Sequence, residues 1–251
     1  MQPNLLILGG TTEATALAHE VAARGVPATL SFAGRVERPK PQPIPVRVGG
    51  FGGVDGLATY LLRHRITHLI DATHPFAARI SRNAVAACAQ AGVPMAALSR
   101  PAWDETATDR WQHVPDIPAA VTALAGTARR VFLALGRMHL AAFATRPQHF
   151  YLLRLVDTPA SPPPLPEHVV IVSRGPFTVG DDTALMRRYG IDLIVSKNAG
   201  GSGARAKIEA ARALSLPVLM IDRPALPERT ELHSPAQVFT WLAHSGANLG
   251  V

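Results

Sequence analysis

Two adjacent glycines separate an apolar run from a polar helix start in the segment LLILGGTTEA, residues 5–14. A glycine turn lets the backbone approach a ligand closely, and the amide groups that open the next helix can bind a phosphate. The third glycine of the usual G-x-G-x-x-G dinucleotide motif is missing, so the segment alone suits a plain strand-to-helix connection equally well. As a cofactor site it offers Gly9, Gly10, Thr11, Thr12 and Glu13, whereas in a plain connection Glu13 is a helix-capping acid.

The second expected strand, PATLSF at 27–32, ends near residues that distinguish two nicotinamide cofactors. NAD-binding folds usually carry an acid about 20 residues beyond the glycines, where it binds the ribose hydroxyls. Residues 30–36 contain no acid but include Ser31 and Arg35, which suit the additional phosphate of NADP. The pattern favours NADP, and a solvated loop arginine is the simpler alternative.

Two more loops of the first half follow expected strands, GGFGG at 49–53 and DATHPFA at 71–77. Ligands of open α/β sheets bind at the carboxyl ends of the strands, where both loops should lie. Histidine exchanges protons near neutral pH, but a single histidine is also often a hydrogen-bonded structural residue. The candidates are Gly50, Phe51 and Thr73 for cofactor contact, and Asp71 and His74 for proton transfer.

The densest polar signal of the second half is SKNAGGSGARAK, residues 196–207. An expected strand leads into a glycine-rich loop and then into a helix. Backbone amides, a helix N-terminus and cations together form an anion site. The P-loop pattern is absent, which argues against nucleotide hydrolysis. The candidate substrate-binding residues are Lys197, Asn198, Gly200, Gly201 and Lys207, together with Arg137 after another expected strand.

Short apolar runs alternate with helical segments along the whole chain, which is typical of parallel sheets covered on both faces. The strand runs exceed what one small parallel sheet holds, so we expect two α/β domains, residues 1–101 and 102–251. MHLAAFA, residues 138–144, is expected to be a helix, and so is a last segment at 235–244. Apolar runs predict strands at 4–8, 27–32, 44–48, 67–72, 93–98, 130–136, 149–156, 168–173, 191–196 and 217–221.

The composition narrows the range of partners. The chain has 251 residues and a formal net charge of +7, which attracts phosphorylated cofactors or polycarboxylates. The basic residues are scattered, so we expect no nucleic-acid partner, and the ten histidines lack metal-ligand spacing. No signal peptide or membrane span is expected, and the single cysteine, Cys88, fits a reducing compartment. We therefore expect a cytoplasmic protein without a metal site.

Taken together, these segments resemble the precorrin-6A reductase family. The resemblance implies NADPH-dependent reduction of the tetrapyrrole precorrin-6A to precorrin-6B in cobalamin biosynthesis. It also implies two Rossmann-like domains with parallel sheets, and a reaction in the cleft between them. The shared stretches, in the family's order, are LILGGTTEA, AGR at 33–35, GGFGG, DATHPFA, SRPAW at 99–103, LGR at 135–137, RGPF at 174–177, and SKNAGG followed by AKIEAAR.

On this basis we expect NADPH in the first domain, with GGFGG and DATHPFA at its nicotinamide end, and the carboxylates of the anionic tetrapyrrole on the cations of the second. The proton donor stays open among His74, Asp71, Lys197 and water. Two alternatives also stay open: a glycosyltransferase that uses a nucleotide sugar, and a regulatory module that binds a nucleotide without consuming it. The sequence leaves open whether the substrate already holds cobalt, and in which oligomeric state the chain works.

Overall fold

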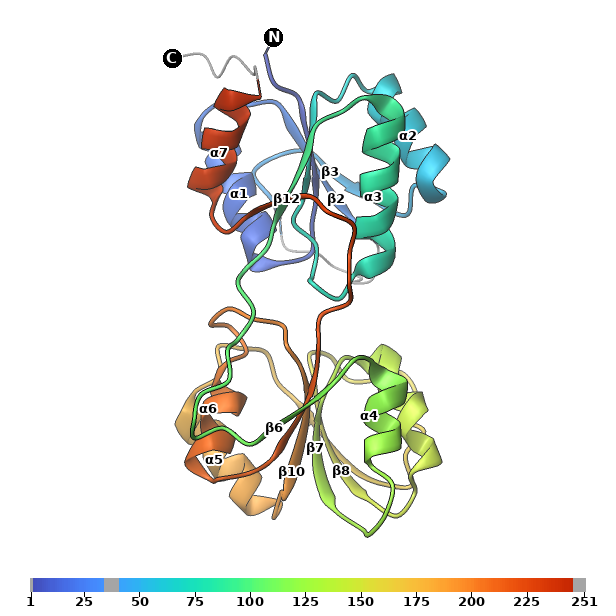
Figure 1. The fold of residues 1–251 in the computed structure, drawn as a ribbon, viewed down its shortest axis with the longest axis vertical. Coiled ribbons are helices and arrows are strands. Elements are labelled where there is room, and N and C mark those ends of the chain that lie inside the picture. The colour runs from blue at the N-terminus through green and yellow to red at the C-terminus, as the bar shows by residue number, and fades with distance from the viewer. Residues whose placement is uncertain (1, 34–40, 246–251) are drawn as a thin grey trace. The chain divides into compact units, whose positions relative to one another are not determined.

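The computed structural model describes residues 2–33 and 41–245 and forms two compact units (Figure 1). The first unit holds the described residues up to Pro101 and those from Ala225 onward, and the second holds Ala102–Pro224. The expected division kept the whole of 102–251 together. The structure differs in the last segment, because a strand and a helix of that segment complete the first sheet.

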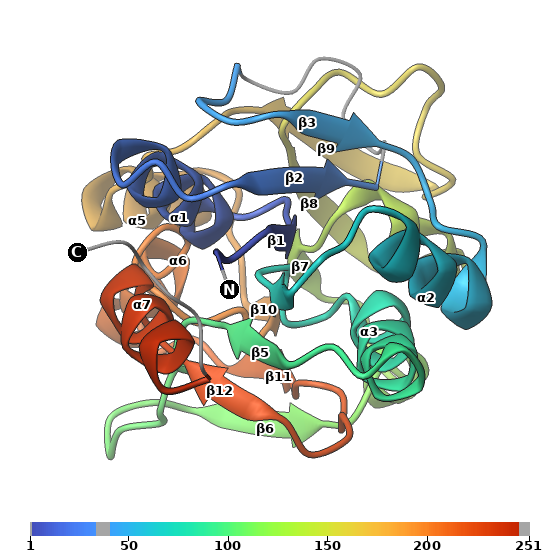
Figure 2. The same ribbon diagram turned by 90° about the horizontal axis from the view of Figure 1, so that it is seen from above.

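The first unit is a six-stranded sheet in which every neighbouring pair is parallel. Its order is β12 (Thr230–Leu232), β5 (Met95–Leu98), β4 (His68–Asp71), β1 (Leu5–Leu8), β2 (Ala28–Phe32) and β3 (Val46–Val48). Figures 1 and 2 show α1 (Thr12–Ala23) and α7 (Pro235–His244) on one face, and α2 (Gly53–Arg63) and α3 (Ala78–Ala91) on the other. The expected Rossmann-like architecture is confirmed for this unit.

The second unit repeats the same plan with another six-stranded, all-parallel sheet. Its order is β6 (Trp111–Val114), β11 (Val218–Ile221), β10 (Leu193–Lys197), β7 (Arg130–Ala134), β8 (Phe150–Leu155) and β9 (Glu167–Val172). Figure 1 shows α5 (Val179–Arg188) and α6 (Ala206–Ala213) on one face and α4 (Ile117–Ala123) on the other, where η1 (Arg137–Thr145) packs against α4. The expected helix at 138–144 exists, but as the 3-10 helix η1.

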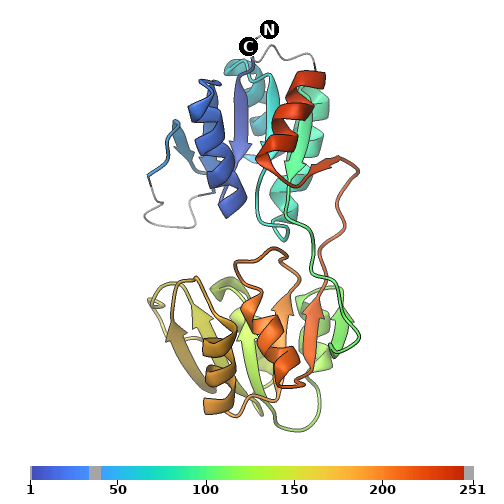
Figure 3. The same ribbon diagram turned by 90° about the vertical axis from the view of Figure 1, so that its left-hand side faces the viewer.

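The outermost strands β6 and β12 are exchanged between the two sheets. β6 follows the first-unit strand β5 in the chain but pairs with β11, and β12 follows the second-unit strand β11 but pairs with β5. Figure 3 shows the two chain segments that this exchange requires between the units. Neither strand was expected from the sequence.

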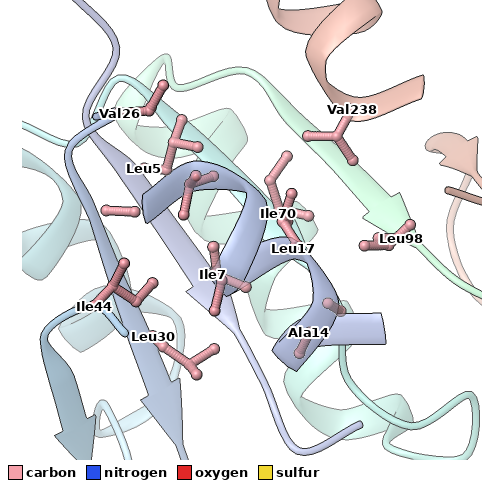
Figure 4. Close-up of a cluster of buried hydrophobic side chains, with 14 of the residues drawn as sticks. Leu5, Ile7, Ala14, Leu17, Val26, Leu30, Ile44, Ile70, Leu98 and Val238 are labelled. Atoms are coloured by element: carbon pink, nitrogen blue, oxygen red, sulfur yellow. The ribbon is translucent and has the colours of Figure 1, made fainter. Parts of the chain in front are cut away.

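The hydrophobic core of the first unit explains why β1 lies at the centre of its sheet. All of its residues are buried, and they alternate between two apolar layers. Leu5 and Ile7 pack with α1 and α7 (Figure 4), whereas Leu6 and Leu8 pack with α2 and α3. A parallel strand covered on both faces requires such a continuous apolar run.

The strand order creates one topological switch point in each sheet, between β1 and β4 in the first and between β7 and β10 in the second. At such a point the connections of two neighbouring strands leave in opposite directions, and a crevice forms beyond their carboxyl ends. The glycine turn after β1 and DATHPFA after β4 flank the first point. LGR after β7 and SKNAGG at the end of β10 flank the second.

Candidate functional site

The glycine turn after β1 is tied to the loop after β4 by a threonine. Thr11 is the N-cap of α1, where its hydroxyl accepts from the amide of Ala14 (3.1 Å) and donates to the carbonyl of Ala72 (2.7 Å). Gly10 has a φ of +121°, and a Cβ there would meet no atom within 4 Å. The conformation of the turn at Gly10 thus favours glycine, and the space next to Gly10 is open. The two hydrogen bonds of the Thr11 hydroxyl fix the shape of the turn.

Glu13 lies in the first turn of α1 and is paired with an arginine that sequence reasoning missed. Arg100 Nη1 lies 3.0 Å from its Oε2 and 3.3 Å from its Oε1, and the Thr12 hydroxyl donates to Oε2 (3.2 Å). Burial alone would raise the pKa of Glu13, but a hydrogen bond from its own amide and the nearby Arg100 charge outweigh burial and lower it. Glu13 is therefore an ionised carboxylate beside the glycine turn, and the charge of Arg100 balances its own. Arg100 lies in SRPAW, one of the stretches that resemble the family, and this resemblance is the feature of the sequence that could have pointed to it.

Asp71, a candidate proton donor, is enclosed by donors at the end of β4. It is 3% exposed, and its Oδ2 accepts from Arg229 Nη1 at 2.8 Å. Its Oδ1 accepts from the amide of Thr73 (3.1 Å) and from the Thr73 hydroxyl (2.6 Å). A buried carboxylate held by these donors anchors the loop. These contacts favour a positioning role for both Asp71 and Thr73 over proton transfer and cofactor contact.

His74 follows in the same loop and keeps its candidate role. Its Nδ1 accepts from the amide of Phe76 at 3.2 Å, so we assign the proton of the neutral ring to Nε2. The ring is half-buried and tilted against Phe76, with 5.8 Å between ring centroids. The ring therefore presents its Nε2–H at the switch point as a hydrogen-bond donor, and His74 would act as a proton donor only with a second proton on the ring.

The cation beside Ser31 in the described residues is Arg47 on β3. Its Nη1 donates to Ser31 Oγ (3.1 Å) and to the carbonyl of Gly49 (2.6 Å), and its Nη2 donates to the carbonyl of Gly50 (2.7 Å). The guanidinium lies 3.8 Å from the centroid of the Phe51 ring. Ser31 and Arg47 are register partners on β2 and β3, a pairing that cannot be derived from the sequence. Arg35, the expected cation, lies outside the described residues.

This grouping changes the expected place of GGFGG. Gly50 and Phe51 gather with Ser31 at the carboxyl ends of β2 and β3, and Gly9 donates to the carbonyl of Ser31 at 2.9 Å. In Rossmann-type sheets the end of the second strand contacts the adenosine ribose of a dinucleotide. This position favours the expected adenosine end over the nicotinamide end for GGFGG.

Gly56, a residue of α2, packs directly against the backbone of Phe51 in the GGFGG loop. A Cβ at Gly56 would lie 1.8 Å from the carbonyl oxygen of Phe51, so Gly56→Ala must displace the loop. We expect a loss of about 1–3 kcal/mol in the free energy of unfolding, together with weaker nucleotide binding. Urea denaturation and nucleotide titration measure the two effects.

The matched control for Gly56→Ala is Gly180→Ala, another glycine near a helix start. A Cβ at Gly180 would have the Thr178 hydroxyl, at 3.9 Å, as its nearest neighbour. Since alanine restricts the unfolded chain more than glycine does, the control should keep or raise stability by about 0.4–1 kcal/mol. Equal behaviour of the two variants would contradict the role given to Gly56.

At the second switch point the structure joins two residues from different elements. Lys197, the last residue of β10, has its Nζ 2.8 Å from Nε2 of His139 in η1. Arg137 opens η1 and is exposed, and Arg223 follows β11, where it donates to the carbonyls of Asn198 (3.1 Å) and Ala199 (3.2 Å). Cations thus follow the adjacent strands β7, β10 and β11. Such an edge suits a polycarboxylate.

Three other candidate residues of the second half contact Trp103, namely Asn198, Gly201 and Lys207. Asn198 accepts from the amide of Trp103 (2.8 Å) and donates to its carbonyl (2.9 Å), while the Trp103 indole donates to the carbonyl of Gly201 (2.6 Å). Lys207 is 5% exposed, donates to the carbonyl of Ala204 and lies 4.8 Å from the centroid of a Trp103 ring. Gly200 and Gly201 have φ values of +72° and +68°. Asn198, Gly201 and Lys207 therefore shape the loop, which favours a supporting role over direct substrate contact.

The remaining expectations concern metals, membranes and the cysteine. Within residues 2–33 and 41–245, no group of three or more His, Cys, Asp or Glu side chains could hold a metal ion. No helix in those ranges is long and apolar enough to cross a membrane. Burial, together with the nearby Asp71 charge, raises the pKa of the Cys88 thiol to about 12. Cys88 is thus an unreactive core residue.

A protein-family model described as "Precorrin-6x reductase CbiJ/CobK" matches residues 4–243, nearly the whole chain and both switch points. The chain belongs to this family. The resemblance inferred from the sequence is therefore confirmed, and the chain is an oxidoreductase.

A relative and a solved structure extend the family match over both units. "Precorrin-6A reductase" of Rhodobacter capsulatus is 56% identical over 243 residues, 97% of each chain. A solved structure titled "CobK precorrin-6A reductase" matches with a TM-score of 0.93 and 55% identity, covering 99% of each chain. A less similar relative, "Cobalt-precorrin-6A reductase" of Priestia megaterium, is 29% identical over 88% of this chain and 91% of its own length.

Proposed function

We propose that this family member reduces precorrin-6A to precorrin-6B in cobalamin biosynthesis, with NADPH as the reductant. The observation that carries the proposal is the 56% identity, across 97% of both chains, to a relative named precorrin-6A reductase. The identity to a relative named for the cobalt-containing substrate is only 29%. This difference supports the cobalt-free substrate.

The first unit fits a phosphorylated dinucleotide. The Gly9–Gly10 turn and the N-terminus of α1 offer amide groups to a diphosphate, and a Cβ at Gly10 would enter open space. Arg100 neutralises Glu13, so that this carboxylate does not repel the phosphates. Arg47 and Ser31, with Arg35 outside the described residues, are assigned to the adenosine ribose and its phosphate. A bound nicotinamide supplies hydride to an electron-poor carbon of a conjugated system.

The second unit is assigned to the tetrapyrrole. Arg137, Lys197 and Arg223 would bind its carboxylates, because a guanidinium or ammonium forms charge-assisted hydrogen bonds with a carboxylate. The loop around Trp103 would form a wall of the binding site. Reduction also requires a proton at the carbon next to the one that receives hydride, and His74 and Lys197 keep this role as candidates. Reduction in a cleft between the two units stays a prediction.

The deciding experiment mixes the purified chain with NADPH and precorrin-6A and follows the loss of cofactor absorbance and the mass of the product. We expect one NADPH to be consumed for each substrate that gains two hydrogens. Omission of precorrin-6A is the control and should leave NADPH unchanged. NADPH binding without consumption would instead favour the nucleotide-sensing module, and turnover of a nucleotide sugar would favour the glycosyltransferase.

A further inference from the structure

The hydrogen bond between Lys197 and His139 crosses the switch point of the second sheet. Lys197 is the last residue of β10, and His139 lies in η1, which begins directly after β7 and Gly136. The amide of His139 donates to the carbonyl of Gly136 (3.1 Å), which fixes the backbone that carries the imidazole. Both side chains are half-buried at this edge of the sheet.

The chemistry of the two nitrogens limits how many protons the pair can share. An ammonium has only N–H donors, so a distance of 2.8 Å between Nζ and Nε2 requires a lone pair on one of them. With Lys197 charged, His139 must be neutral and accept through Nε2. The pair can therefore carry at most one positive charge, because with a further proton neither nitrogen could accept and the hydrogen bond would break.

We propose that His139 is a positioning residue that holds Lys197 as the proton donor of the reduction. This inference rests on the proposed function. Lysine is a flexible side chain, and an imidazole acceptor anchored on η1 restricts the direction in which its ammonium points. Arg137 and Arg223, which follow the neighbouring strands, are then left to bind carboxylates.

The step balances in atoms and charge. As hydride from NADPH forms a C–H bond at one carbon, the neighbouring carbon forms its C–H bond with a proton of the Lys197 ammonium. The N–H bond breaks and its electron pair stays on nitrogen. The pair is then an uncharged amine beside an uncharged imidazole, and a proton from water restores the single charge.

The test compares His139→Phe, which removes the acceptor, with His139→Gln, whose side-chain oxygen can still accept from Nζ. We expect His139→Phe to lower kcat by about 100-fold or more, the lower range for general acid catalysis, with the KM for precorrin-6A nearly unchanged. His139→Gln should recover most of kcat. The matched control is His19→Phe, which replaces an exposed histidine on α1 and should leave both constants as they are.

A double-mutant cycle shows whether the two residues act together. Lys197→Met should lower kcat at least as far as His139→Phe, and the double variant should lose no more than Lys197→Met alone, since residues that act as a unit are not additive. NADPH titration and the unfolding midpoint check that the variants are folded and bind cofactor.

The proposal would be overturned if the losses of kcat in His139→Phe and Lys197→Met were additive in the double variant, or if His139→Gln lost as much kcat as His139→Phe. It would also be overturned if the Lys197 and His139 variants raised the KM for precorrin-6A and kept a normal kcat. This last outcome would make Lys197 a carboxylate ligand only. If the wild-type chain oxidises no NADPH with precorrin-6A, the proposed function itself fails, and this inference, which rests on it, fails too. If the wild-type chain is active and the His139 variants turn over normally, only the role given to His139 fails.

Discussion

Replacing Arg229 by Met is expected to lower the free energy of unfolding by about 3–5 kcal/mol, the cost of leaving a buried charge without its partner. Arg229 belongs to the first unit and immediately precedes β12, and its side chain is 8% exposed. Its partner, Asp71, lies 2.8 Å away with a side chain that is 2% exposed. The pair joins the exchanged strand to the end of β4, so the DATHPFA loop should loosen and catalysis should fall with stability. Urea denaturation measures the first effect and steady-state turnover the second.

Two further variants make the stability result specific. In Arg229→Met with Asp71→Asn, no charge is left buried, and the asparagine oxygen can still accept from Thr73, so much of the stability should return. Arg24→Met is the control in the same unit. Arg24 pairs with Glu20 at 3.5 Å and their side chains are 52% and 50% exposed, so a loss of about 1 kcal/mol or less is expected. A loss in Arg229→Met no larger than in this control would contradict the anchoring role.

Arg47→Ala is expected to weaken NADPH binding by about 10- to 100-fold, the range for losing a hydrogen bond to a charged group. NADH should be affected far less, because it lacks the phosphate that we assign to Arg47. Calorimetric titration with NADPH, NADH and the 2′-phosphorylated adenosine fragment measures this without any turnover. Arg47→Lys keeps the charge but loses the planar fork, so an intermediate affinity for NADPH is expected.

The same titrations test Arg35, the cation that the sequence indicated. Arg35→Ala should also weaken NADPH more than NADH, and equal weakening of both would remove the 2′-phosphate assignment from Arg35. For Arg47, equal weakening would mean that the variant disturbs the GGFGG loop, whose Gly49 and Gly50 carbonyls it holds, and would contradict a role in cofactor choice.

Local sequence patterns were sufficient to predict ten of the twelve described strands and the edge of each sheet that carries the candidate sites. Strands buried on both faces need uninterrupted apolar runs, and LLIL at β1 and VLMI at β11 are such runs. Turns that need a positive φ select glycine, which made Gly10 and the Gly200–Gly201 pair visible. Because the carboxyl ends of parallel strands lie at one edge, loops distant in sequence could be assigned to a common edge.

The tertiary structure decided which strands complete each sheet and what each polar group contacts. β6 (WQHV) and β12 (TEL) are short, with polar and exposed residues, so no local periodicity marks them, and only pairing with β11 and β5 makes them strands. Asp71 is one of several candidate proton donors in the sequence, yet its contact with Arg229, 158 residues away, favours a role as an anchor. His139 meets Lys197 across 58 residues. The sequence thus determined which residues stand at the strand ends, since that depends on local apolar and glycine patterns. Their partners, which set charge and orientation, come from elements that meet only when the chain is folded.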